Sequence, residues 1–145
     1  MKTKIQYILL MLIASVAWAC EADGDEGLPS FANSLPLYVQ LDGSASISAE
    51  EGEEVAITIE LPEVIYSDVI VQYEVIGDIA GSGSVTIQEG DLTADALVTI
   101  PDDTQMTGGG VATFSLTAVD NGLSLGRPNV ATSIISTTIE WTDND

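Results

Sequence analysis

The sequence predicts an all-β protein whose folded part is an antiparallel β-sandwich of about seven strands. Three observations lead to this fold class. Apolar and polar residues alternate with a period of two in several runs between residues 37 and 145, which is typical of strands with one buried face. β-Branched residues dominate these runs, and no stretch after residue 20 has a convincing helical period. The runs are short and are separated by Gly, Pro, Asn and Asp, as in sandwich folds.

The first element is a secretory signal peptide, predicted to span residues 1–19. Lys2 and Lys4 precede an apolar run at residues 8–14, and small residues lead to a boundary at Ala19. A charged start, a short apolar centre and a small-residue cleavage site define such a leader. The apolar run is too short for a membrane-spanning helix.

Cys20, the only cysteine of the chain, follows this boundary directly. The segment Ala17-Trp18-Ala19 fits ordinary secretory cleavage, but together with Cys20 it also resembles a bacterial lipobox. Ordinary cleavage would leave a lone free thiol on a secreted protein, which is an oxidation liability. We therefore expect lipidation of Cys20. The protein would then be anchored to the outer membrane of a Gram-negative bacterium, in the periplasm or at the cell surface.

Residues 20–36 are predicted to be the lipidated cysteine and a flexible tether, because they are acidic, contain two Gly and two Pro, and show no periodicity. Four early acids resemble the acidic tag of surface-exported lipoproteins: Glu21, Asp23, Asp25 and Glu26. A solvated linker with no further role is the alternative.

The folded domain is predicted to span residues 37–145. In each of its five longest alternating runs, the residues of one group share the inward face of a predicted strand. The groups are Val55, Ile57, Ile59 and Leu61; Val69, Val71, Tyr73 and Val75; Ala96, Val98 and Ile100; Phe114, Leu116 and Ala118; and Ile135, Thr137, Ile139 and Trp141. Shorter strands fit residues 37–41, 45–48 and 85–88. Turns are expected at residues 42–43, 51–52, 81–84, 89–91, 108–110 and 120–122, where Gly, Asn and Asp gather.

The composition excludes several classes of function. The chain has 23 acidic residues and only three basic ones, Lys2, Lys4 and Arg127. Cleavage before Cys20 would leave the 23 acids with Arg127 alone, a net charge of −22, so we expect no nucleic-acid partner. The chain has no His, which removes His-based catalysis and His-ligated zinc. Carboxylates, hydroxyls and a hard cation remain.

Three segments, read in order, resemble a Calx-beta domain, an immunoglobulin-like sandwich found in the sodium–calcium exchanger and in bacterial surface proteins. The first is a strand, a Glu-rich corner with Gly and a long alternating strand, at residues 46–59. The second leads from Glu89-Gly90-Asp91 through a strand to Asp102-Asp103. The third is the last strand with its closing acids, residues 138–145. The chain departs from the family at Thr107-Gly108-Gly109-Gly110, where an acid-rich turn is usual.

The resemblance implies a calcium site at one end of the sandwich. Calcium-binding members gather these three acidic corners, and Ca²⁺ takes six to eight oxygen ligands. The ligands implied for this chain are Glu50, Glu51, Asp102, Asp103, Asp143 and Asp145. No other cofactor is expected.

The leading hypothesis is a non-catalytic envelope or surface lipoprotein. It would display the sandwich for adhesion, for ligand capture or for assembly with an envelope protein or a glycan. A carbohydrate-binding module is an alternative, with Tyr38 and Tyr66 as its aromatic platforms. A carboxylate-based hydrolase using Asp102 and Asp103 is a further alternative. We expect no enzyme, since adjacent residues of one turn point apart and a domain of this size rarely encloses a cleft.

Overall fold

The computed structural model describes residues 36–43, 45–102, 104, 108–130 and 133–144. All of them belong to one compact unit, Leu35–Asp145. The expected signal peptide, Cys20 and nearly all of the tether lie outside the described residues, as do Asp103 and Asp145. No helix among the described residues is long and apolar enough to cross a membrane.

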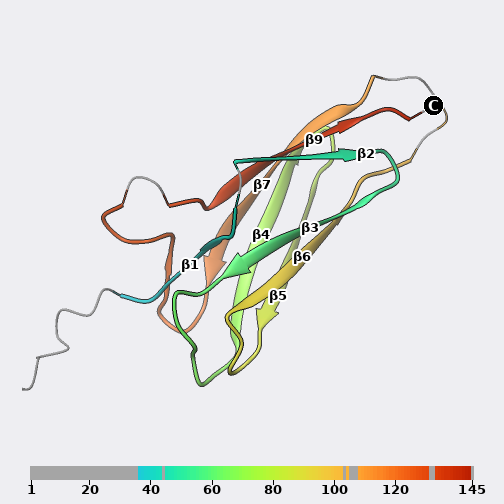
Figure 1. The fold of residues 1–145 in the computed structure, drawn as a ribbon. Helices are drawn as coiled ribbons and strands as arrows, with labels where there is room; N and C mark the ends of the chain where they lie inside the picture. Colours follow the sequence, from blue (N-terminus) through green and yellow to red (C-terminus); the bar gives the residue numbers. More distant parts are fainter. Residues whose placement is uncertain (1–35, 44, 103, 105–107, 131–132, 145) are drawn as a thin grey trace, which may run out of the picture. The chain divides into compact units, whose positions relative to one another are not determined.

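The described residues form nine strands (Figure 1). They are β1 (Tyr38–Leu41), β2 (Ser46–Glu50), β3 (Glu54–Glu60), β4 (Val69–Gly77), β5 (Gly81–Ile87), β6 (Thr93–Thr99), β7 (Gly110–Val119), β8 (Ser124–Leu125) and β9 (Ser136–Thr142).

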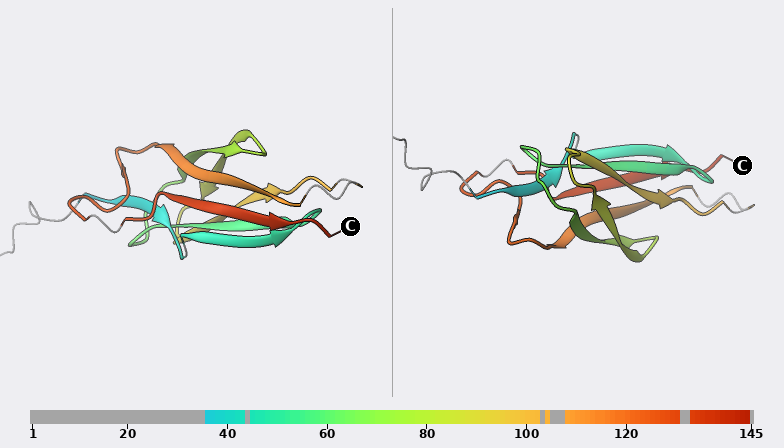
Figure 2. Two further views of the ribbon diagram at one scale, coloured as in Figure 1. Left: turned by 90° about the horizontal axis from the view of Figure 1, so that it is seen from above. Right: turned by 90° about the horizontal axis from the view of Figure 1, so that it is seen from below.

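The strands form two sheets, one with the order β6-β3-β1-β8 and the other with the order β2-β9-β7-β4-β5. Figure 2 shows the strands of the two sheets from two further directions. Most neighbouring strands are antiparallel, whereas β1 pairs with β8, and β2 with β9, in parallel. The prediction of an all-β sandwich is confirmed, with two more strands than expected and with these two parallel pairs.

The core lies between the sheets and is built by the alternation seen in the sequence. Inward-facing residues of β3 are buried while their neighbours are exposed or half-buried, and β4, β6 and β7 follow the same rule over most of their lengths. The largest fully buried side chains are Phe114, Ile59, Ile87, Ile100, Ile139, Val39, Val69 and Val71. Removing this apolar surface from water is the main driving force for folding.

Ala118 was assigned to a core face, but it pairs with the exposed Gln72 beside a register shift and is only half-buried. Three other local predictions were also wrong. Ile135, assigned to a core face, is 38% exposed and lies just before β9. Residues 81–84, expected to be a turn, form the first half of β5, where seven residues pair with β4. Strand β8 was not predicted, because two residues are too few for a periodic signal. Tertiary pairing overrides local turn propensity in the second case, since β4 supplies the hydrogen-bonding partner.

Candidate functional site

Three chain segments that are distant in sequence meet at one end of the sandwich, which we call the acidic end. They are the turn from Glu50 to Glu53 between β2 and β3, the segment after β6 and the segment after β9. Backbone hydrogen bonds tie them together. The Ile100 N–H donates to the Glu53 carbonyl at 2.9 Å, and the Glu51 N–H donates to the Thr142 carbonyl at 3.1 Å.

The turn is a direct product of its sequence. Glu53 donates its N–H to the Glu50 carbonyl at 3.2 Å, and the Glu50 N–H donates to the Glu53 carboxylate at 2.9 Å. Gly52 has a φ of +80°, a backbone conformation that residues other than glycine rarely adopt. A Cβ placed on Gly52 would lie 3.4 Å from the Cβ of Asp102. The turn therefore brings Asp102 into contact with the Glu-rich corner.

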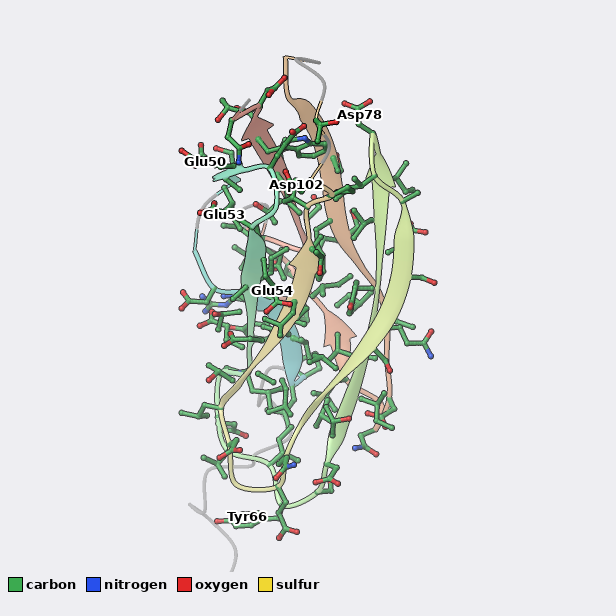
Figure 3. All side chains as sticks on the ribbon, turned by 90° about the vertical axis from the view of Figure 1, so that its right-hand side faces the viewer. Glu50, Glu53, Glu54, Tyr66, Asp78 and Asp102 are labelled. Atoms are coloured by element: carbon green, nitrogen blue, oxygen red, sulfur yellow. The ribbon has the colours of Figure 1, made fainter. Side chains whose placement is uncertain are left out.

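The implied calcium ligands have unequal positions. Glu51 is 6% exposed, and its carbonyl accepts a hydrogen bond from the Asn144 side chain at 3.0 Å. Asp143 is half-buried, whereas Glu50 and Asp102 are exposed. Figure 3 shows Glu50, Glu53 and Asp102 at the same end. Within the described ranges no group of three or more acidic side chains is close enough to hold a metal ion.

The Gly108–Gly110 segment has a packing role at this end. The Gly108 N–H donates to the Asp143 carboxylate at 3.1 Å. A Cβ on Gly109 would lie 2.1 Å from the Trp141 carbonyl oxygen, and a Cβ on Gly110 would lie 2.3 Å from the Trp141 indole. These glycines therefore let the start of β7 lie against the end of β9. This is the physical reason for glycine where an acid-rich turn is usual.

An open depression of about 890 Å³ lies beside these segments. Glu50, Glu53, Asp78 and Glu140 contribute acidic side chains to its lining, and Trp141 contributes an aromatic one. The sequence argument missed three of these acids. Glu53 belongs to the Glu-rich corner, and Glu140 lies on the polar face of the last strand. The local sequence pattern could therefore have placed both of them near the predicted site. Asp78 had none, because only the pairing of β4 with β7 brings it here.

Asp78 illustrates how tertiary structure positions an acid. It follows the last residue of β4, and its N–H donates to the Val111 carbonyl at 3.0 Å. Its carboxylate accepts a hydrogen bond from the Val111 N–H at 2.9 Å. The two bonds fix the carboxylate at the rim of the depression, next to the start of β7.

The acidic end has no basic residue in its own segments: residues 48–54, 100–110 and 140–145 contain no Lys, Arg or His. Arg127 follows β8, and β8 pairs with β1. Strand β1 in turn pairs with Ile59 and Glu60, the end of β3 that lies away from the acidic end. None of the three segments therefore contains a cation that could balance the negative charge of this end.

The aromatic residues considered for carbohydrate binding do not form a common platform. Tyr66 is 86% exposed, whereas Tyr38 is half-buried in β1. Figure 3 places Tyr66 at the end of the sandwich away from Glu50 and Asp102. One exposed tyrosine is less than the row of coplanar aromatics that such a face needs.

The structure is a β-sandwich whose fold is similar to that of Calx-beta domains. No model of a known family matches the sequence, and no curated protein is similar to it. Among solved structures, the chain is similar to an apo-form Calx CBD1 domain, with a TM-score of 0.61 and 14% identity over 76% of this chain and 99% of that one.

Two longer structures are also similar. CBD12 from CALX1.2 has a TM-score of 0.59 and 15% identity, over 74% of this chain and 46% of that one. The calcium binding domain CBD12 of CALX1.1 has a TM-score of 0.57 and 17% identity, over 75% of this chain and 44% of that one. The chain thus spans slightly less than half the length of these two structures. At these identities the similarity establishes the fold.

Proposed function

We propose that the chain is a non-catalytic β-sandwich module of an envelope lipoprotein, and that its acidic end binds Ca²⁺. The observation that carries this proposal is the meeting of three acid-bearing segments at one end of the sandwich, without a basic residue in any of them. Carboxylates gathered without a cationic neighbour attract a cation from solution.

The donor set fits a hard cation. All candidate ligand atoms are carboxylate or backbone oxygens, which Ca²⁺ prefers over nitrogen and sulfur ligands. The described carboxylates do not form a group of three. The ligand set implied by the family resemblance therefore stays a prediction: Glu50, Glu51, Asp102, Asp103, Asp143 and Asp145. One structural neighbour is described as a calcium binding domain, which agrees with this proposal.

The envelope location rests on the sequence of the first 36 residues. The predicted leader would direct the chain across the inner membrane, lipidation of Cys20 would anchor it, and the acidic tether would separate the sandwich from the lipid surface. Adhesion, ligand capture or assembly with neighbouring proteins suits a sandwich displayed in this way.

The fluorescence of Trp141 can report calcium binding at the acidic end. Trp141 lies two residues before Asp143, is 8% exposed, and is the only tryptophan after residue 19. We expect millimolar Ca²⁺ to shift its emission and to raise the melting temperature, because a ligand of the folded state stabilises that state. With a Kd of about 10⁻⁴–10⁻³ M, ten times Kd would add about 1.4 kcal/mol, or about 5 °C.

The controls separate a site from general screening. NaCl of matched ionic strength should produce a smaller effect, because it screens charge without binding specifically. Asp102→Asn should weaken the calcium response. Asp91→Asn should not, since it removes the same charge from the β5–β6 turn. If both salts act equally and Asp102→Asn behaves as wild type, the acidic end is only a solvated surface.

A further inference from the structure

We propose that the free edge of β5 binds an extended segment of a partner protein in which apolar and basic residues alternate. The segment would add to the five-stranded sheet as a sixth strand, next to β5. This inference does not depend on calcium, because none of the predicted calcium ligands belongs to β4 or β5. The inference rests on the proposed role of the module in assembly, and it specifies the chemistry of the partner.

The edge of β5 carries neither a charge nor a proline that would oppose strand addition, and β6 of the other sheet lies beside it without pairing. β5 has seven residues, pairs only with β4, and contains no charged residue and no proline. The other described edges are protected: β2 ends in Glu50, β6 carries Asp95, and β8 has two residues. Edge strands of monomeric proteins are normally kept short or charged, because their free N–H and C=O groups recruit other strands.

The side chains of β5 leave its backbone accessible. Its first four residues alternate Gly and Ser, and Gly81, Ser82 and Ser84 are exposed. Tyr73 of β4 lies against Gly83, where an added Cβ would come within 2.6 Å of the phenol oxygen. The short side chains place no bulk beside the backbone groups that an added strand would use. Main-chain hydrogen bonds supply affinity in this type of recognition.

The inner side of the edge offers space for apolar side chains. A cleft of about 200 Å³ lies there, between β5 and β6. It is lined by the apolar residues Val75, Ile79, Ala80, Leu97 and Val98 and by Tyr73, Gly81, Ser82 and Thr99. Leu97 is 54% exposed. Alternate side chains of a strand added to β5 would point toward this cleft. Apolar residues at those positions would remove Leu97 and the cleft walls from water.

The outer side of the edge is acidic. Glu74 pairs with Ser82, and Gln72 with Ser84, so the side chains of each pair share the outer face. These four residues line a depression of about 420 Å³. An added strand would lie two strand spacings from β4, about 10 Å, and the two serines would not block a long side chain. A lysine or arginine on its outer face would therefore reach toward Glu74.

Charge favours a partner over a second copy of this chain. Each processed copy would carry a net charge of −22, so edge-to-edge pairing would bring two strongly negative surfaces together. Glu74, on the outer face beside β5, is the carboxylate that a basic residue of the added segment would meet.

The test uses the full chain in mild detergent with EDTA, so that calcium binding cannot contribute. The probe is a blocked eight-residue peptide of alternating lysine and valine, titrated by fluorescence anisotropy. Hydrogen exchange then locates the bound peptide. We expect saturable binding and slower exchange of amides in Gly81–Ile87. A peptide N-methylated along one backbone edge should not bind, and a glutamate–valine peptide should not bind.

Matched variants locate the site. Glu74→Gln should weaken binding about fivefold, whereas Asp42→Asn, which removes the same charge after β1, should not. Ser84→Lys should weaken binding, and Ser46→Lys on the β2 edge should leave it unchanged. Equal binding of the N-methylated peptide, protection at β2 or β6, or a concentration-dependent dimer protected at β5 would overturn the proposal. None of these results would bear on calcium binding.

Discussion

At the scale of single residues, the core of the larger sheet is organised around one aromatic pair. Phe114 of β7 is fully buried, and its ring stacks on Tyr73 of β4 with 4.7 Å between ring centroids and 25° between planes. Stacked aromatic pairs contribute about 0.5–1.5 kcal/mol beyond the burial of their area. Gly83 leaves room for the phenol of Tyr73. The pair thus links β7, β4 and β5.

Phe114→Ala should lower the free energy of unfolding by about 3–5 kcal/mol, because it removes a fully buried ring and leaves a cavity. Denaturant unfolding of the two proteins measures this difference. Thr113→Ala, an exposed neighbour on the same strand, is the matched control and should change stability by less than about 0.5 kcal/mol. A loss below about 1 kcal/mol for Phe114→Ala would contradict the packing described above.

At the scale of elements, the acidic end depends on the close approach of β7 to β9. Gly109 and Gly110 lie directly against Trp141, and Gly108 holds the Asp143 carboxylate. β9 is also the parallel neighbour of β2, whose last residue, Glu50, opens the Glu-rich turn. Any change that separates β7 from β9 is therefore expected to disturb the acids that follow β9.

Gly109→Ala and Gly108→Ala test this contact as a pair. Both residues have positive φ, +80° and +87°, so both substitutions carry a conformational cost of about 1 kcal/mol. Only Gly109→Ala would also place a Cβ against the backbone of β9, whereas Gly108 has open space. We expect Gly109→Ala to destabilise the protein by about 1–3 kcal/mol more, as overpacking does. Equal unfolding midpoints would show that β7 and β9 are not in this contact.

At the scale of the whole molecule, the net charge limits the surfaces that the sandwich can approach, and the proposed lipid anchor would decide where it is held. A processed chain with a net charge of −22 is repelled by anionic lipid headgroups. A lipid anchor at Cys20 would hold it at a membrane all the same, since the acyl chains supply the binding energy. The acidic tether would then keep the folded domain away from the surface.

Cys20→Ala should release the protein from membranes or stop its processing. We expect wild-type protein in the membrane fraction and in the detergent phase after phase separation, because a diacylated cysteine partitions into lipid. Fractionation with an antibody against the folded domain provides the measurement, and mass spectrometry of the first residue identifies the lipid. Soluble wild-type protein with a free thiol at its first residue would refute the lipoprotein hypothesis.

The sequence by itself determined the fold class, the inward faces of the long strands and most turns. These features are local. Side chains alternate between the two faces of any strand, so a strand with one buried face has apolar and polar residues in alternation. Val55, Ile57 and Ile59 were assigned to the core on this basis and are buried. Glu51-Gly52 was likewise recognised as a turn.

Only the tertiary structure decided which strands pair, and therefore which side chains meet. Asp78 reaches the acidic end because β4 pairs with β7, the parallel pairing of β2 with β9 brings Glu51 to Thr142, and residues 81–84 become an edge strand because β4 lies beside them. Such contacts join residues that are distant along the chain. A local pattern contains no information about them, since the free energy that selects one pairing comes from the packing of both sheets together.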